Sequence, residues 1–140
     1  MTMRDHGEML STLARADAGR IKAFAETLID ALGEITVVES RTGLVMLPMR
    51  DTAGGTAFHL GEVLVSEAHI SQGGTIGYGM RRGRDLEAAM AMALIDLAAA
   101  CGSGADACAA FCAQEAAAQA EQDRQTLRRV EATRVDMETF

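Results

Sequence analysis

The first third of the chain predicts two helices, because its apolar residues recur every three or four positions. These residues are Met9, Leu10, Leu13 and Ala14 in the first helix and Ile21, Phe24, Leu28 and Leu32 in the second. Asp17 is placed to cap the second helix with its carboxylate, and Gly33 is placed to end it.

From residue 35 onward the pattern changes to that of short strands. The apolar and β-branched segments are residues 35–38, 44–49, 58–60, 63–70 and 76–80. They are separated by segments rich in Gly, Asp and Thr, which favour turns. The segment 44–49 is apolar on both faces, which is typical of a strand covered on both sides. Its Pro48 indicates an edge strand or a strand end. We expect an antiparallel meander of four to five strands.

The last strand has one apolar face and one glycine face. Gly77 and Gly79 permit another backbone, or a ligand, to come close. Asp85 then caps a third helix. The apolar stripe of this helix is Leu86, Ala89, Met90, Ala93, Leu94 and Leu97. We expect the stripe to cover the sheet and to face Ile76 and Tyr78.

The segment 106–134 predicts one long helix, because Ala, Gln, Glu and Arg dominate it. Its length would be about 44 Å, whereas a compact chain of this size is about 37 Å across. The helix should therefore project. Its distal residues either form a solvated tail or contact another chain, for which the interface candidates are Leu127, Val130, Arg134 and Val135. On the second alternative the isolated protein forms a homodimer or a higher oligomer.

Together these elements predict an α+β fold: two helices, an antiparallel meander, then two helices with the last one projecting. We expect a single domain over residues 1–140, with a compact body at 1–104 and a C-terminal helical arm at 105–140. A chain of 140 residues is long enough to bury one core.

Composition limits the classes of partner that the chain is expected to bind. The formal net charge is −7, and the chain has one Tyr and no Trp, so a nucleic-acid surface is not expected. No apolar run approaches the roughly 20 residues of a membrane span. The N-terminus carries no apolar signal core. We expect a cytoplasmic protein.

Motifs for catalysis or metal binding are missing from the sequence. None of the three histidines falls in a diagnostic motif, and no phosphate loop is found. His59 alternates with Phe58 and Leu60, which is typical of a partly exposed strand histidine more than of a catalytic one. It stays a candidate for binding a phosphate or a partner. The three cysteines, at 101, 108 and 112, fit buried thiols and not metal ligands. We expect no catalytic residue, no metal and no cofactor.

The best local candidate for binding is the segment Arg81-Arg82-Gly83-Arg84-Asp85. Arginines before a helix N-terminus can bind a phosphate, since the free N–H groups and the guanidinium forks both favour anions. Alternatively, Asp85 and Glu87 already occupy the helix end and the arginines pair with them. Both interpretations stay open.

Several segments together resemble a known family. They are Gly43-Leu44-Val45-Met46 with Arg50, residues 58–65, Gly74–Gly79, Gly83-Arg84-Asp85, residues 89–96 and Thr133–Asp136. This pattern is similar to that of PhnG, the G subunit of the bacterial carbon–phosphorus lyase core complex. Because Gly83-Arg84-Asp85 belongs to the family pattern, the resemblance favours Arg84 and Asp85 over Arg81 and Arg82 as site residues.

The resemblance implies a subunit that works only in an assembly with the H, I and J subunits. With H, I and the L subunit, the G subunit supports displacement of adenine from ATP by an alkylphosphonate, which forms a ribose 1-phosphonate 5-triphosphate. Nucleosidase activity lies in I and radical S-adenosylmethionine chemistry in J. We therefore expect an accessory, non-catalytic subunit. The alternative is a free-standing small-molecule or anion-binding module outside phosphonate metabolism.

Overall fold

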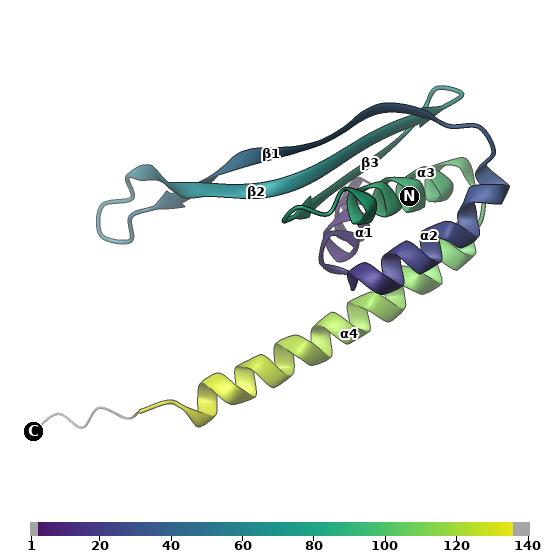
Figure 1. Ribbon diagram of the computed structural model, residues 1–140. Coiled ribbons are helices and arrows are strands. Elements are labelled where there is room, and N and C mark those ends of the chain that lie inside the picture. Colours follow the sequence, from purple (N-terminus) through teal and green to yellow (C-terminus); the bar gives the residue numbers. More distant parts are fainter. Residues whose placement is uncertain (1–2, 136–140) are drawn as a thin grey trace, which may run out of the picture.

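Four helices and a three-stranded antiparallel sheet make up residues 3–135, the part of the chain that the computed structural model describes. The elements are α1 (Met3–Arg15), α2 (Ala18–Leu32), β1 (Thr36–Arg50), β2 (Ala57–Gln72), β3 (Thr75–Arg82), α3 (Leu86–Cys101) and α4 (Ala105–Ala132). The sheet lies over α3, and α1, α2 and the start of α4 lie beneath (Figure 1). This order of elements confirms the predicted α+β class.

The prediction of four to five strands is wrong, because the described chain forms three. The segments expected as separate strands are continuous within β1 and β2, which pair from Thr36↔Ser71 to Arg50↔Ala57. Gly43 and Gly61 had suggested breaks. Neither has a positive φ, so both are extended strand residues. Where the chain does turn, between β2 and β3, Gly73 and Gly74 have φ values of 54° and 86°.

The glycine face of β3 packs on the backbone of α3. A Cβ at Gly79 would overlap the carbonyl oxygen of Ala89, and one at Gly77 would overlap that of Ala93. The expectation of a close backbone approach is confirmed. The expectation that the α3 stripe faces Ile76 and Tyr78 is wrong, because these side chains lie on the opposite face of β3 from the two glycines. Ile76 is 56% exposed there.

The core surrounds α3. Its buried residues are Ala88, Ala89, Ala91, Met92, Ala93, Leu94, Ile95, Asp96, Leu97 and Ala98, whereas Leu86 is exposed. Leu13 of α1, Ile21 of α2 and Ile70 of β2 are fully buried around it. The predicted caps are confirmed: Asp17 accepts a hydrogen bond from the Arg20 amide, and Gly33 ends α2.

The outer face of the sheet body carries charged and polar side chains beside the exposed Ile76. Across it, Arg41 donates to Glu67 at 3.1 Å, and the rings of His69 and Tyr78 meet edge to face at 6.3 Å. An antiparallel sheet with one buried and one polar face is adapted to water on that side. This face of the sheet body is therefore more polar than either face of the strands beyond the end of β3.

Candidate functional site

Beyond the end of β3, the strands β1 and β2 continue as a two-stranded ribbon, here called the hairpin arm (residues 44–64). β3 pairs with β2 only from Gln72 to Val65, and the hairpin arm extends past that point into open space (Figure 1). Leu44↔Leu64 is the pair at its root, and residues 51–56 form the loop at its tip.

Both faces of the hairpin arm are apolar and exposed. Partners across an antiparallel pair point to the same side, and neighbours along a strand alternate. Leu44 and Met46 therefore lie on one face, and Val45 and Leu47 on the other. The exposed large apolar side chains are Leu44, Val45, Met46, Leu47, Met49, Phe58 and Leu60, each 42–63% exposed. A monomer in water rarely presents such a continuous apolar surface, so the arm has the character of an interface.

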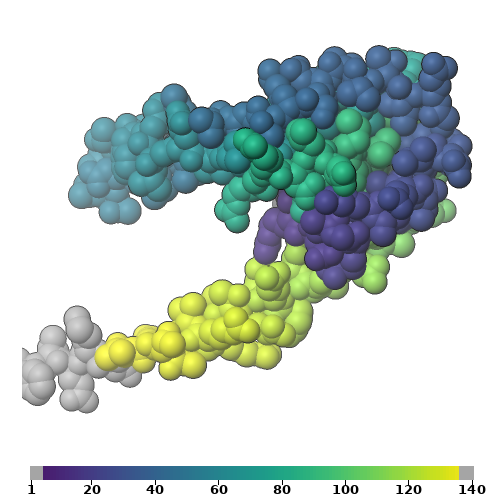
Figure 2. Space-filling view, in the orientation of Figure 1, coloured from purple at the N-terminus to yellow at the C-terminus, as the bar shows by residue number. Residues whose placement is uncertain are grey.

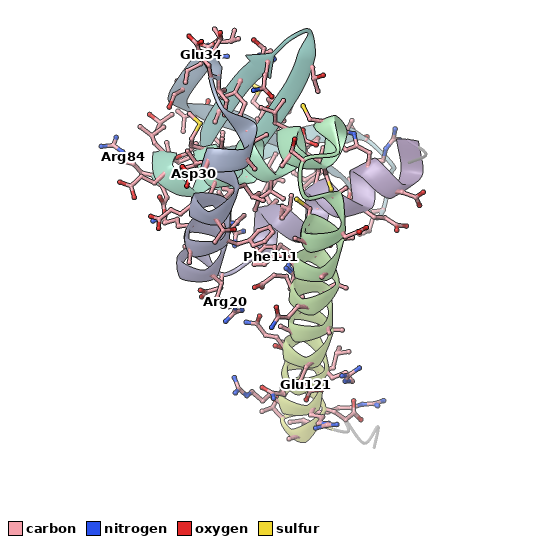
Figure 3. The ribbon with its side chains drawn as sticks, turned by 90° about the vertical axis from the view of Figure 1, so that its right-hand side faces the viewer. Arg20, Asp30, Glu34, Arg84, Phe111 and Glu121 are labelled. Atoms are coloured by element: carbon pink, nitrogen blue, oxygen red, sulfur yellow. The ribbon has the colours of Figure 1, made fainter. Side chains whose placement is uncertain are left out.

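The C-terminal helix forms a second projection. α4 begins against the body, where Phe111 stacks on Phe24 with ring centroids 4.6 Å apart. Figure 3 labels Phe111 on α4 and Arg20 on α2, where these two helices lie side by side. Further along, α4 leaves the body on the same side as the hairpin arm (Figure 2). Residues 124–135 are here called the helix arm.

Polar contacts, not apolar ones, hold the middle of α4. The carboxylate of Glu115 is buried and accepts from Arg20 at 2.6 Å and 3.2 Å. Gln119 donates to the Thr12 carbonyl at 2.9 Å, and Arg15 pairs with Asp123 at 3.0 Å. The hydrogen bonds from Arg20 hold the pKa of the Glu115 carboxyl below its ordinary value. We call Glu115, Gln119 and Asp123 the polar row of α4.

The helix arm carries the predicted interface residues. Leu127, Val130 and Val135 are 66%, 60% and 80% exposed. At about 3.6 residues per turn, Val130 points in a direction between those of Gln119 and Asp123. It therefore lies on the side of α4 that contacts α1 nearer the body. Arg134 pairs with Glu131 at 3.2 Å.

The turn from β3 into α3 brings four of the predicted site residues together. Gly83 has a φ of 95°, and its carbonyl accepts from the buried hydroxyl of Ser66. Asp85 caps α3 by accepting from the Ala88 amide, and it pairs with Lys22 at 3.0 Å. These interactions lower the pKa of the Asp85 carboxyl, the Ala88 hydrogen bond most of all.

The arginines at this turn differ in their contacts. Arg81 points inward and donates to the carbonyls of Leu13 and Ala16 at 2.5 Å and 2.6 Å, which caps the end of α1. Burial lowers the pKa of Arg81. Arg84 is exposed and points away from the body (Figure 3). Among the described residues, neither Arg82 nor Arg84 has a hydrogen-bond or ion-pair partner. A phosphate contact by Arg84 stays a prediction.

The remaining predicted residues lie apart from this turn. His59 is exposed in the hairpin arm, opposite Pro48. Cys108 is buried, which raises the pKa of its thiol to about 11, whereas Cys101 is exposed and contradicts the expectation of three buried thiols. Within residues 3–135, no group of His, Cys, Asp and Glu is arranged to hold a metal ion. None of the helices described has the length and apolarity to cross a membrane.

Two functional features were not anticipated from sequence. The two-faced apolar pattern of residues 44–49 had indicated a covered strand, and the structure leaves that strand without cover in the isolated chain. The signal was therefore present, but it was assigned to an internal neighbour. The polar row had no signal of its own, since Glu115 and Asp123 look like any charged residues on a helix face.

A family model of the phosphonate metabolism protein PhnG matches residues 4–140, nearly the whole chain. The chain belongs to the PhnG family. Over 135 residues it is 34% identical to the alpha-D-ribose 1-methylphosphonate 5-triphosphate synthase subunit PhnG of Rhizobium meliloti (strain 1021), covering 95% of this chain and 86% of that protein.

A second relative comes from Stutzerimonas stutzeri and is described as the putative C-P lyase subunit protein HtxH. The two sequences are 31% identical over 102 residues, which cover 64% of this chain and 27% of that protein. Both relatives are named as subunits of a larger enzyme. The expected family is thereby confirmed.

Proposed function

We propose that this chain is an accessory subunit of the enzyme complex that joins the ribose triphosphate part of ATP to an alkylphosphonate. Its partners are the H, I and J subunits of carbon–phosphorus lyase, with the L subunit needed for turnover, and the complex works in the cytoplasm. The chain alone has no activity on ATP. It contributes by holding partner subunits in place through the hairpin arm and the helix arm.

One observation carries this proposal: the hairpin arm is apolar on both faces and exposed on both. A binding site for a small molecule would be a concave pocket, whereas this surface is convex and extended (Figure 2). Burying such a surface stabilises an association by roughly 25 cal/mol per Å² of apolar area, before the entropy costs of binding. Membership of a family whose relatives are named as subunits points the same way.

The test is co-expression with tagged H, I and J subunits, followed by purification of the complex. Leu60→Asp in the hairpin arm is compared with Ile76→Asp on the outer face of the sheet body. The two native side chains are 58% and 56% exposed, so the substitutions are matched for exposure. Leu60→Asp should abolish recovery of this chain in the complex, and Ile76→Asp should leave it unchanged. Equal recovery of both variants would contradict the proposal.

We further propose that the helix arm contacts another chain, which is a second copy when the protein is purified alone. Leu127 and Val130 supply the apolar contact, with Arg134 and Val135 beside them. Light scattering should give a dimer or larger species for the intact chain. A version ending after Arg124 keeps the polar row and should be monomeric. A monomeric intact chain, together with normal assembly of the shortened one, would exclude the helix arm as an interface.

A second candidate role concerns Arg84, because it is exposed and unpaired among the described residues in an otherwise acidic protein. The residue would supply a guanidinium to the triphosphate in a site shared with a partner. Arg84→Ala should then leave assembly intact and lower adenine release from ATP and methylphosphonate. Lost assembly would assign Arg84 to an interface, and full turnover would exclude both roles.

A further inference from the structure

The sheet has three edge segments, and the surroundings of the main chain differ from one to the next. They are the outer edge of β3, the outer edge of β1, and the part of β2 that extends beyond the end of β3. An unpaired strand edge presents free N–H and C=O groups and is a template for another strand. Each of the first two edges is interrupted at one position within this chain.

At the outer edge of β3, a side chain of α3 engages one main-chain amide. The buried carboxylate of Asp96 accepts the Tyr78 amide at 2.9 Å with one oxygen, and its other oxygen lies 2.7 Å from the His6 ring nitrogen. This amide is therefore not available to a further strand. Arg81, near the end of β3, is also engaged with the end of α1.

Beside the hairpin arm, Pro48 interrupts the outer edge of β1 at one position. The Leu64 carbonyl accepts from the Gly83 amide on the β3 side, so Leu64 points its main-chain groups away from β1. Since these groups alternate along a strand, Leu44 and then Pro48 direct theirs to the outer edge of β1. Proline has no N–H to offer there, which is a common protection of natural edges.

The edge of β2 over residues 57–63 has no proline and no covering side chain, although the register with β1 shifts at Leu60. By the same alternation, Glu62 directs its N–H and C=O away from β1. In the body, β3 lies on this side of β2. Its last main-chain hydrogen bond to β2 runs from the Gly83 amide to the Leu64 carbonyl, and the chain then turns into α3. The turn is fixed by Ser66, which prevents β3 from extending further. Among the described strands, none occupies the place beside Glu62.

We propose that an extended segment of a partner subunit pairs with β2 along residues 57–64 and continues the line of β3. This inference rests on the proposed function, because it names how the hairpin arm meets its partner. The segment would be about eight residues long, or about 27 Å at about 3.4 Å per residue. Such pairing is a known mode of peptide recognition, with affinity from the main chain and specificity from alternate side chains.

Charge defines the chemistry of this segment. Arg82 and Arg84, both exposed and unpaired among the described residues, lie where the segment would meet the end of β3. The segment should therefore carry an acidic residue at that end. It should carry a basic residue opposite Glu62, the one carboxylate between residues 57 and 64. Its other positions should be apolar, to match the two apolar faces of the arm.

The test is hydrogen exchange of the Glu62 amide, in the isolated chain and in the complex purified with the H, I and J subunits. The amide should exchange rapidly in the isolated chain and at least about tenfold more slowly in the complex. Two variants add a second measurement. Glu62→Pro removes the N–H and should reduce recovery of the complex, whereas Glu62→Ala keeps the N–H and should reduce it far less.

Each outcome has one meaning. An unprotected Glu62 amide in an assembled, active complex overturns the paired segment and leaves the proposed function standing. Protection already present in an isolated homodimer overturns it too, because a second copy then occupies the edge. Failure of any complex to form counts against both proposals. If Glu62→Pro does not fold, the exchange measurement on the unmodified chain still decides.

Discussion

The strands β1 and β2 each run through two different surroundings. In the body, their inner face is buried on α3 through Ala68 and Ile70, and their outer face carries the Arg41–Glu67 pair. In the hairpin arm, the same two strands are apolar on both faces and neither face is covered. The same pair of strands, whose register shifts at Val37/Glu39 and at Leu47/Pro48, thus joins a segment with a polar outer face to one that is apolar on both faces.

This difference shows in which part of the isolated chain the apolar side chains are buried and in which part they are not. In the body, one face of the sheet is buried on α3 and the other carries mostly polar side chains, so we expect the body to fold without another molecule. In the arm, the main chain of β1 and β2 is paired, but the side chains lack the burial that such composition normally has. Stability should therefore reside in the body and association in the arm, and substitutions can separate the two.

The largest effect is expected from a glycine pair. Gly79→Ala should lower the free energy of unfolding by more than about 4 kcal/mol or prevent folding, because the added Cβ overlaps the α3 backbone. Gly61→Ala places a Cβ in open space in the arm and should change it by less than about 0.5 kcal/mol. Urea unfolding measures both. Similar losses would show that the arm is packed as tightly as the body.

A second pair compares apolar side chains on the same strand. Ile70→Ala truncates a fully buried residue of the body and should lower the free energy of unfolding by about 2–5 kcal/mol. Leu60→Ala truncates an exposed residue of the arm and should cost less than about 1 kcal/mol. Urea unfolding of the isolated chain checks this. If Leu60→Ala costs as much as Ile70→Ala, the arm is not independent of the core.

Arg81 and Arg84, on either side of Arg82-Gly83, extend the comparison to the turn that follows β3. Arg81→Ala removes the donors to the end of α1 and should lower the free energy of unfolding by about 1–3 kcal/mol. Arg84→Ala should change it by less than about 0.5 kcal/mol, since the side chain is exposed. Thermal unfolding at neutral pH suffices. A large loss for Arg84→Ala would reveal a structural role.

The smallest effect concerns the attachment of α4 and its pH dependence. The pKa of Glu115 is lowered by folding, so its contribution is present above the ordinary Glu pKa of about 4.3 and lost as the pH falls through the lower folded value. Glu115→Gln should cost about 1 kcal/mol at pH 7, and this cost should shrink as the pH falls below the ordinary Glu pKa. Unfolding at several pH values measures the difference. A cost that stays constant with pH would contradict it.

Sequence patterns predicted most elements of this fold, because local signals dominate there. Asp17, Asp85 and the Gly73–Gly74 turn are read from neighbours within a few residues. The number of strands was misjudged at Gly43 and Gly61, since a glycine in a strand and a glycine in a turn look alike in sequence. Only pairing with the opposite strand distinguishes them, and that pairing joins distant residues.

The candidate site was predictable in part. The projecting end of α4 followed from length alone, and Leu127 and Val130 were named in advance. The exposed state of residues 44–49 could not be read from their composition, because a strand buried in its own core and one buried in a complex have the same apolar pattern. Likewise, Arg81 and Arg84 look equivalent in sequence, and only the position of the α1 carbonyls separates them.

The polar row also determines how well the direction of the projecting end of α4 is defined. Glu115 and Asp123 are about 12 Å apart along the axis, and Val130 lies about 10 Å beyond Asp123 at roughly 1.5 Å per residue. The anchored and the projecting parts of α4 are therefore nearly equal in length, so a small displacement at the anchors gives a displacement of similar size at Val130. Hydrogen bonds are directional, unlike apolar contacts, and they also prevent rotation about the axis. The free end of α4 thus has a defined orientation already in the isolated chain.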